Sequence, residues 1–317
     1  MTTIENSANR TDGAPDDSAR LPRRSATAIQ AAPPEPAAAV RRRVSVTRRF
    51  FQRPIATFFS AFLLFTTLAC FVGPLFTAAP SAADFTTLQP PSGEHLMGTD
   101  QLGRDVLSRV LAGGQVSLIV GVSVALICLT LAVLIGGLAG YHGGFADALL
   151  MKVSEFFQVV PGLILALVAA AMLGSSMVII VIILSLTMWP QVARIVRAEA
   201  IRISELGYIE SARAAGFGSF RIFRSDVLPN AFPPVLVATT MTIGRAILLE
   251  SGLAFLGLGD ANTPSWGALL NAAQPFMQTA WWLTLFPGLA IFLVVLSTNV
   301  LGDHLNDTLN PTIGRVK

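Results

Sequence analysis

Six apolar runs, separated by polar or Gly/Pro-containing segments, constrain the fold of this chain more than any other feature. They are residues 56–76, 116–138, 156–173, 177–192, 234–249 and 281–301. A bilayer core about 30 Å thick needs roughly 20 apolar residues in a helix, and the runs are close to that length. The chain is only 13% charged, whereas a soluble domain carries about a quarter charged residues. We therefore predict an all-α integral membrane protein with six transmembrane helices.

The remaining segments suggest how the chain is divided. Residues 1–45 mix Ser, Thr, Asp, Ala, Pro and Arg and hold too little apolar surface to fold, so we expect a disordered tail. Residues 46–114 hold the first transmembrane helix and the segment that follows it. Residues 115–305 hold the other five helices, with a polar loop at about 194–230. Residues 306–317 form a short second tail.

Basic residues are spread unevenly over the two sides of the predicted membrane domain. The residues through Arg53 carry ten arginines, and the 194–230 loop carries six. The other basic residues on that side are Lys152, Arg315 and Lys317. Only Arg104 and Arg109 lie on the opposite side, so the positive-inside rule places both termini and the loop in the cytoplasm. The arginines before the first run then act as anchors at the lipid surface, and we do not expect nucleic-acid binding.

A polar, arginine-bearing segment lies between the fourth and fifth apolar runs. It contains, in order, Glu210, Ser211, Ala212, Gly216, Leu228 and Pro229. Glu210 is placed to open a short helix near its positive end, and Gly216 to let the backbone turn after that helix. Pro229, Pro233 and Pro234 are expected to end one helix and begin the next.

The segment between the first two runs alternates acidic and basic residues around two glycines. Its residues are Gly98, Asp100, Gly103, Arg104, Asp105 and Arg109. Pairing of either arginine with Asp100 or Asp105 is expected to hold an external cap in place. A phosphate or metal site built from His95, Asp100 and Asp105 is the alternative, but the spacing is unlike a zinc site.

Two charges lie in or at the end of the fifth run. Arg245 and Glu250 are costly in a bilayer and should face a cavity or a partner. Because they are five residues apart, they point about 140° away from each other on a helix. We expect both to line a path through the membrane, Arg245 there favouring a carboxylate-bearing cargo over a cation. A structural ion pair with another helix is the alternative for each.

Signs of catalysis are missing from the sequence. The only lysines, Lys152 and Lys317, do not follow the glycine pattern that cradles phosphates. Three histidines, His95, His142 and His304, are scattered among loops and span ends. We therefore predict a non-catalytic chain that binds no cofactor or metal itself.

The motif from Glu210 to Pro229 resembles the EAA loop of ABC-transporter importer permeases. That consensus reads Glu-Ala-Ala, three residues, Gly, nine residues, Ile, one residue, Leu-Pro. Ser211 replaces the first alanine, and Asp226 replaces the isoleucine of the general consensus and the histidine usual in the peptide subfamily. In the family, this loop forms a short cytoplasmic helix that docks in a cleft of a separate ATPase subunit.

Further motifs resemble the second permease subunit of dipeptide, oligopeptide and nickel importers. They are Gly98-Thr99-Asp100, Gly103-Arg104-Asp105, Ser108-Arg109, the run from Glu250 to Gly259, Pro264-Ser265-Trp266-Gly267 and Leu301-Gly302-Asp303. Ser251, Gly252 and Ala254 depart from the family, as does Asn306 in place of arginine. The resemblance covers about residues 48–311.

The resemblance implies a type I ABC importer permease fold in a bacterial cytoplasmic membrane. It also implies a homologous permease as heterodimer partner, two ATPase subunits or domains, and an external substrate-binding protein. ATP and Mg would be used by the partners. The expected cargo is a di- or oligopeptide, with nickel or another small solute as the alternative. A secondary transporter or channel fits less well, because neither needs a docking loop.

Overall fold

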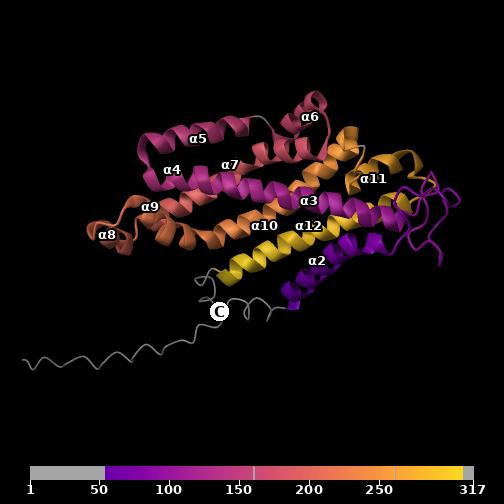
Figure 1. Ribbon diagram of the computed structural model, residues 1–317, viewed down its shortest axis with the longest axis horizontal. Coiled ribbons are helices and arrows are strands. Elements are labelled where there is room, and N and C mark those ends of the chain that lie inside the picture. Colours follow the sequence, from indigo (N-terminus) through magenta and orange to yellow (C-terminus); the bar gives the residue numbers. More distant parts are fainter. Residues whose placement is uncertain (1–53, 160, 261, 310–317) are drawn as a thin grey trace, which may run out of the picture. The chain divides into compact units, whose positions relative to one another are not determined.

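The computed structural model describes residues 54–159, 161–260 and 262–309, all within the compact unit Val44–Lys317. The predicted tail at 1–45 and the end of the 306–317 tail lie outside the described residues. Regular structure in the described part is helical, apart from one isolated antiparallel bridge between Thr99 and Asp105 (Figure 1). The α-helices are α2 (Pro54–Val72), α3 (Val106–Leu131), α4 (Gly137–His142), α5 (Gly144–Val159), α6 (Gly162–Leu173), α7 (Met177–Ser204), α8 (Gly207–Ala214), α9 (Ser219–Ile222), α10 (Leu228–Leu253), α11 (Trp266–Ala273) and α12 (Trp282–Leu309).

Within the described residues, five helical stretches are long and apolar enough to cross a membrane. They are Pro54–Leu75, Val106–His142, Met177–Ser204, Ser219–Leu258 and Trp282–Leu309. The third predicted span, residues 156–173, is not one straight helix. It is divided between α5 and α6, which are bent by 77° at their junction and together make a sixth candidate span. Pro161 lies at the junction, with an extended backbone (ψ 122°) where α6 begins.

The second predicted span begins ten residues earlier than the apolar run at 116–138 indicates. Asp105 has an extended backbone and accepts a hydrogen bond from the backbone N–H of Ser108 (2.8 Å), so it caps α3. A capping carboxylate satisfies an N–H group that the first turn leaves free. Helix then continues through the π-helical turn η2 (Ala132–Gly136) into α4. The polar and glycine-containing first turns of α3 hide this start from a hydropathy pattern.

The expectation that three prolines separate two helices is wrong, because Ser219–Leu258 is one continuous helical stretch that runs through all of them. Pro229 is the second residue of α10 and directly follows the π-helical turn η3 (Phe223–Val227) without a break. Pro233 and Pro234 lie inside the same helix, which continues through them. Each removes one backbone hydrogen bond, a loss that helices in membrane proteins accommodate by local adjustment.

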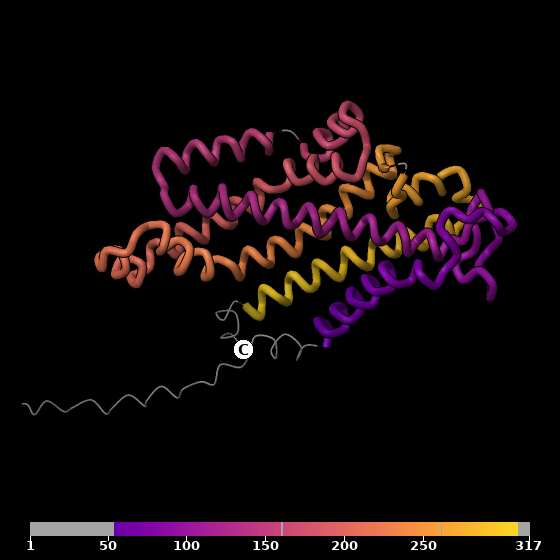
Figure 2. The backbone as a smooth tube through the Cα atoms, viewed as in Figure 1, coloured from indigo at the N-terminus to yellow at the C-terminus, as the bar shows by residue number. Residues whose placement is uncertain are grey.

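Close backbone contact joins α7 to the end of the second span. A methyl group added at Gly136 would lie 2.2 Å from the carbonyl oxygen of Ala193, and one at Gly140 would lie 2.5 Å from that of Arg197. Small residues spaced by four let membrane helices approach this closely. Further along, α10 packs against α3, α7 and α12, and Figure 2 shows these helices running side by side.

The two polar motifs lie at opposite ends of this bundle. Helices α8 and α9, from the 194–230 loop, lie at one end in Figure 1. Helix α11 and the segment before α3 lie at the other end.

Candidate functional site

Helix α8 packs against the bundle through a buried inner face. Ile209 is fully buried, in a cluster to which α7 contributes Ile203 and α10 contributes Ala231. Its neighbours Tyr208 and Glu210 are exposed, Glu210 in the first turn, where a carboxylate is favoured by the helix dipole. The helix therefore buries one face and exposes the other, which carries Tyr208 and Glu210.

A glycine ends α8. Gly216 has a φ of +80°, and its N–H donates to the carbonyl of Arg213 (3.0 Å). The N–H of Phe217 donates to the carbonyl of Ala212 (3.2 Å). These two bonds form a Schellman motif, in which the left-handed residue is usually glycine. No atom of the described residues lies within 4 Å of a methyl group added at Gly216, so its backbone conformation is what requires glycine.

Aromatic side chains surround the turn after α8. The Arg213 guanidinium lies over the ring of Tyr141 in α4, 5.7 Å from its centre, and so connects α8 to α4. Phe217 and Phe220 are exposed, Phe220 by 74%. We call Tyr208, Glu210, Phe217 and Phe220 the α8 surface. Of the other motif residues, Ser211 and Pro229 are exposed, while Ala212 and Leu228 are half-buried.

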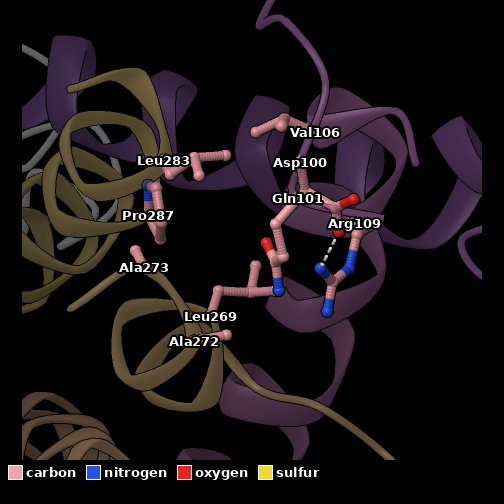
Figure 3. A pocket seen from close by; sticks show the side chains of 9 residues that line it. All are labelled: Asp100, Gln101, Val106, Arg109, Leu269, Ala272, Ala273, Leu283 and Pro287. Carbon is pink, nitrogen blue, oxygen red and sulfur yellow. Dashed lines mark hydrogen bonds and ion pairs between the residues drawn. The ribbon is translucent and has the colours of Figure 1, made fainter. Parts of the chain in front are cut away.

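At the opposite end, Asp100 holds both arginines of its motif. Its Oδ2 accepts from Arg104 Nε (2.7 Å) and from Arg109 Nη1, and its side chain is 2% exposed. Figure 3 shows the Arg109 guanidinium directed at this carboxylate beside a cavity of about 20 Å³, room for no more than a water. Burial alone raises the pKa of Asp100. Hydrogen bonds from the backbone N–H groups of Arg104 and Leu102, with the two guanidinium groups, outweigh burial and lower it.

The rest of this motif shapes the loop. Asp105 caps α3 and lies 3.4 Å from Nδ1 of His95. Gly98 and Gly103 have φ of +78° and +71°, and a methyl group at Gly103 would lie 2.0 Å from the carbonyl oxygen of Phe85. The indole N–H of Trp282, the first residue of α12, donates to the carbonyl of Thr99 (3.1 Å).

Arg245 opens into a cavity of about 470 Å³ between α5, α6, α7 and α10, which we call the Arg245 cavity. The side chain is exposed and donates through Nη1 to Oε1 of Gln191 in α7. Among the described residues, Arg245 makes no ion pair. We did not predict Gln191 from the sequence, although a polar residue in an apolar run is itself a signal of function.

Glu250 lies on another side of α10. It is 2% exposed and accepts hydrogen bonds from the hydroxyl groups of Ser117 and Ser251, both at 3.3 Å. It does not line the Arg245 cavity. The two charges predicted for one path therefore have different surroundings, one open and one packed inside the bundle.

Comparison with known proteins gives these sites their context. The family described as "Binding-protein-dependent transport system inner membrane component" matches residues 132–315. The dipeptide transport system permease protein DppC of Bacillus subtilis (strain 168) is 38% identical over 257 residues, covering 80% of both chains. The glutathione transport system permease protein GsiD of Pectobacterium atrosepticum is 36% identical, covering 84% of this chain and 90% of its own. The di/tripeptide transport system permease protein DppC of Pseudomonas aeruginosa (strain UCBPP-PA14) is 38% identical, covering 71% of this chain and 77% of its own.

The family match begins at the π-helical turn before α4 and continues past the end of α12 to residue 315, and so includes α8 and the Arg245 cavity. The three relatives extend the similarity over most of the chain. This chain belongs to the family of binding-protein-dependent transport system inner membrane components.

Proposed function

We propose that this chain is the permease subunit of an ATP-driven peptide importer and that α8 is the helix an ATPase subunit binds. As a family member, the chain is a multi-pass inner-membrane permease component of an ABC importer. Such a permease works with ATPase and substrate-binding partners. The observation that carries the proposal is the α8 surface, which exposes Glu210 and Phe220 while the buried Ile209 attaches the helix to the bundle. A helix that is attached to the bundle on one side and exposed on the other can transmit movement between a partner and the bundle.

The proposal assigns sides to the two ends of the bundle. The charge asymmetry of the sequence supports a cytoplasmic position for α8 and both termini. The segment that contains Asp100 and helix α11 then face outward, toward the substrate-binding protein.

The same proposal assigns the partners. A homologous permease pairs with this chain, and two ATPase subunits or domains bind ATP and Mg on the cytoplasmic side. We propose that this chain binds neither. Peptide cargo is supported by the dipeptide and di/tripeptide systems named for two of the relatives.

The test is a charge reversal on α8 in the complete importer, reconstituted with its substrate-binding protein. Glu210→Lys should abolish peptide uptake and the stimulation of ATPase activity by cargo, while the complex still assembles. Glu205→Lys is the matched control, because Glu205 is exposed and changes charge equally but lies before α8. Normal coupling in Glu210→Lys would refute the α8 assignment. Uptake of nickel but not of peptides by the wild-type complex would refute the cargo.

A further inference from the structure

We propose that Arg245 and Gln191 form a carboxylate-binding site inside the translocation path. In this site the Arg245 guanidinium donates a hydrogen bond to the neutral Gln191 amide until the carboxylate of a passing cargo replaces that amide as the acceptor. This inference rests on the proposed function, since it names the chemical group of the peptide that the path recognises.

Both residues lie in helices long and apolar enough to cross a membrane. Gln191 is 14 residues after the start of α7, about 20 Å along it at 1.5 Å per residue, and three residues before Arg194, where the predicted polar loop begins. Arg245 is 17 residues after the start of α10, about 26 Å along it. An exposed guanidinium at this depth would be costly against lipid, so this face of α10 borders water or a protein partner.

The face that carries Arg245 is open in this chain. Leu248, one turn further along α10, lines the same cavity and is 51% exposed. A cavity of about 470 Å³ is within the range that holds small ligands. The second permease of the importer would close its open side.

The chemistry of the lining favours an anion. Its polar side chains are those of Arg245, Gln191, Gln158 and Thr187, and none of the described lining residues is acidic. Arginine binds a carboxylate through two parallel hydrogen bonds, whereas the Gln191 amide oxygen is a single neutral acceptor. Exchange of the amide for a carboxylate is therefore favourable. Between cargoes the amide keeps the guanidinium hydrogen-bonded.

The experiment compares how fast one introduced thiol reacts with an anionic and with a cationic reagent. Leu248→Cys is placed in a chain whose buried Cys70 and Cys128 are replaced, and the complete importer is assembled in inside-out vesicles. The thiol is labelled with an anionic sulfonatoethyl or a cationic trimethylammonioethyl methanethiosulfonate. A single positive charge about 6 Å away favours the anion over the cation by about tenfold even at the dielectric constant of water. We expect Arg245→Gln to abolish that preference and Arg245→Lys to keep it.

Gln191 provides the matched pair of variants. Gln191→Glu, nearly the same shape, supplies a permanent carboxylate to Arg245 and should abolish the preference as fully as Arg245→Gln does. Gln191→Leu should retain it. Alanyl-phenylalanine should protect the thiol from labelling, whereas its C-terminal amide should not. Gln191→Glu should lose that protection.

Two results would overturn the proposal: a labelling preference unchanged by Arg245→Gln, and equal protection by the peptide and its amide. If Arg245→Gln fails to assemble, Gln191→Glu decides instead, and an unchanged labelling preference in that variant would overturn the proposal. If the labelling preference for the anionic reagent depends on Arg245 in a complex that imports no peptide, the proposed peptide cargo is refuted. The proposal that Arg245 belongs to an anion-binding site would then stand.

Discussion

Arg197 in α7 binds Asp147 in α5 through two contacts, from Nε to Oδ1 and from Nη2 to Oδ2, both 2.5 Å. Paired contacts of this kind are stronger and more directional than a single one. Asp147 lies in the first turn of α5, where a carboxylate also stabilises the helix dipole. Because the carbonyl of Arg197 also packs against Gly140, α4 and α5 are both fixed to the same turn of α7.

Breaking this ion pair should loosen the α4–α5 hairpin. Asp147→Ala and Arg197→Ala should each lower the melting temperature of the purified importer, and the double variant should be no worse than either. The side chains are 17% and 33% exposed, so we expect a coupling of about 1 kcal/mol, at the upper end of the range for exposed pairs.

The control is the pair Lys152–Glu155, whose side chains are 78% and 49% exposed. Removing that pair should leave the melting temperature unchanged. Additive losses from Asp147→Ala and Arg197→Ala would show that the two residues act independently.

The sequence was enough to predict most of the spans, because a bilayer requires long apolar helices whatever their neighbours. The sequence did not predict helix boundaries that depend on how neighbouring helices pack. The continuation of α10 through Pro233 and Pro234 depends on packing that no local pattern contains. The bend at Pro161 was instead available from the Pro161-Gly162 pair, a local turn signal that the hydropathy pattern overlooks. The start of α3 at Val106 was available from the capping residue Asp105, which the hydropathy pattern overlooks.

The candidate sites were predictable to a smaller extent. Motif spacing located α8 and the turn at Gly216, since a helix end depends on local backbone geometry. The partner of Arg245 was not predictable, because Gln191 is 54 residues away and only the packing of α7 on α10 brings them together. The same holds for Asp147 and Arg197, which are 50 residues apart.

Low pH should weaken the ion pairs that Asp100 makes with Arg104 and Arg109. Because the pKa of Asp100 is lowered in the folded chain, its contribution to stability is complete above the ordinary value of 3.8. The contribution is lost as the pH falls through the lowered pKa. Asp100→Asn leaves two arginines without their carboxylate and should cost about 3 kcal/mol at pH 7.

The measurement is the melting temperature of wild type and Asp100→Asn from pH 7 to pH 3. The difference in melting temperature between wild type and Asp100→Asn should stay constant down to about pH 4 and become smaller below it. Asp84→Asn, in the exposed part of the same segment, should match wild type throughout. A gap that already narrows between pH 7 and pH 5 would contradict the lowered pKa.

The proposed topology can be checked with two thiols. Ser92 and Ser219 are exposed, Ser92 in the segment before α3 and Ser219 at the start of α9, and these two elements lie at opposite ends of the bundle in Figure 1. In a chain without Cys70 and Cys128, Ser92→Cys should react with an impermeant reagent added outside intact cells, and Ser219→Cys only after the membrane is opened. Labelling of Ser219→Cys in intact cells would reverse the assignment.

The last prediction separates two reasons for glycine at the end of α8. A side chain in the left-handed conformation of Gly216 costs roughly 1–2 kcal/mol for most residues, but asparagine tolerates it. Gly216→Ala should therefore impair coupling of ATPase activity to uptake, and Gly216→Asn should retain more of it although asparagine is larger. Gly207→Ala is the control, because Gly207 also has no atom within 4 Å and its φ is not positive.

Coupling is measured as peptide imported per ATP hydrolysed in equal amounts of assembled complex. If backbone conformation alone requires glycine, activity falls in the order wild type, Gly216→Asn, Gly216→Ala, with Gly207→Ala equal to wild type. If Gly216→Asn instead couples less well than Gly216→Ala, the size of the side chain at position 216 limits coupling. The part of the chain that the structure describes puts no atom beside Gly216, so the atoms that exclude the larger side chain would then belong to the ATPase proposed to bind α8.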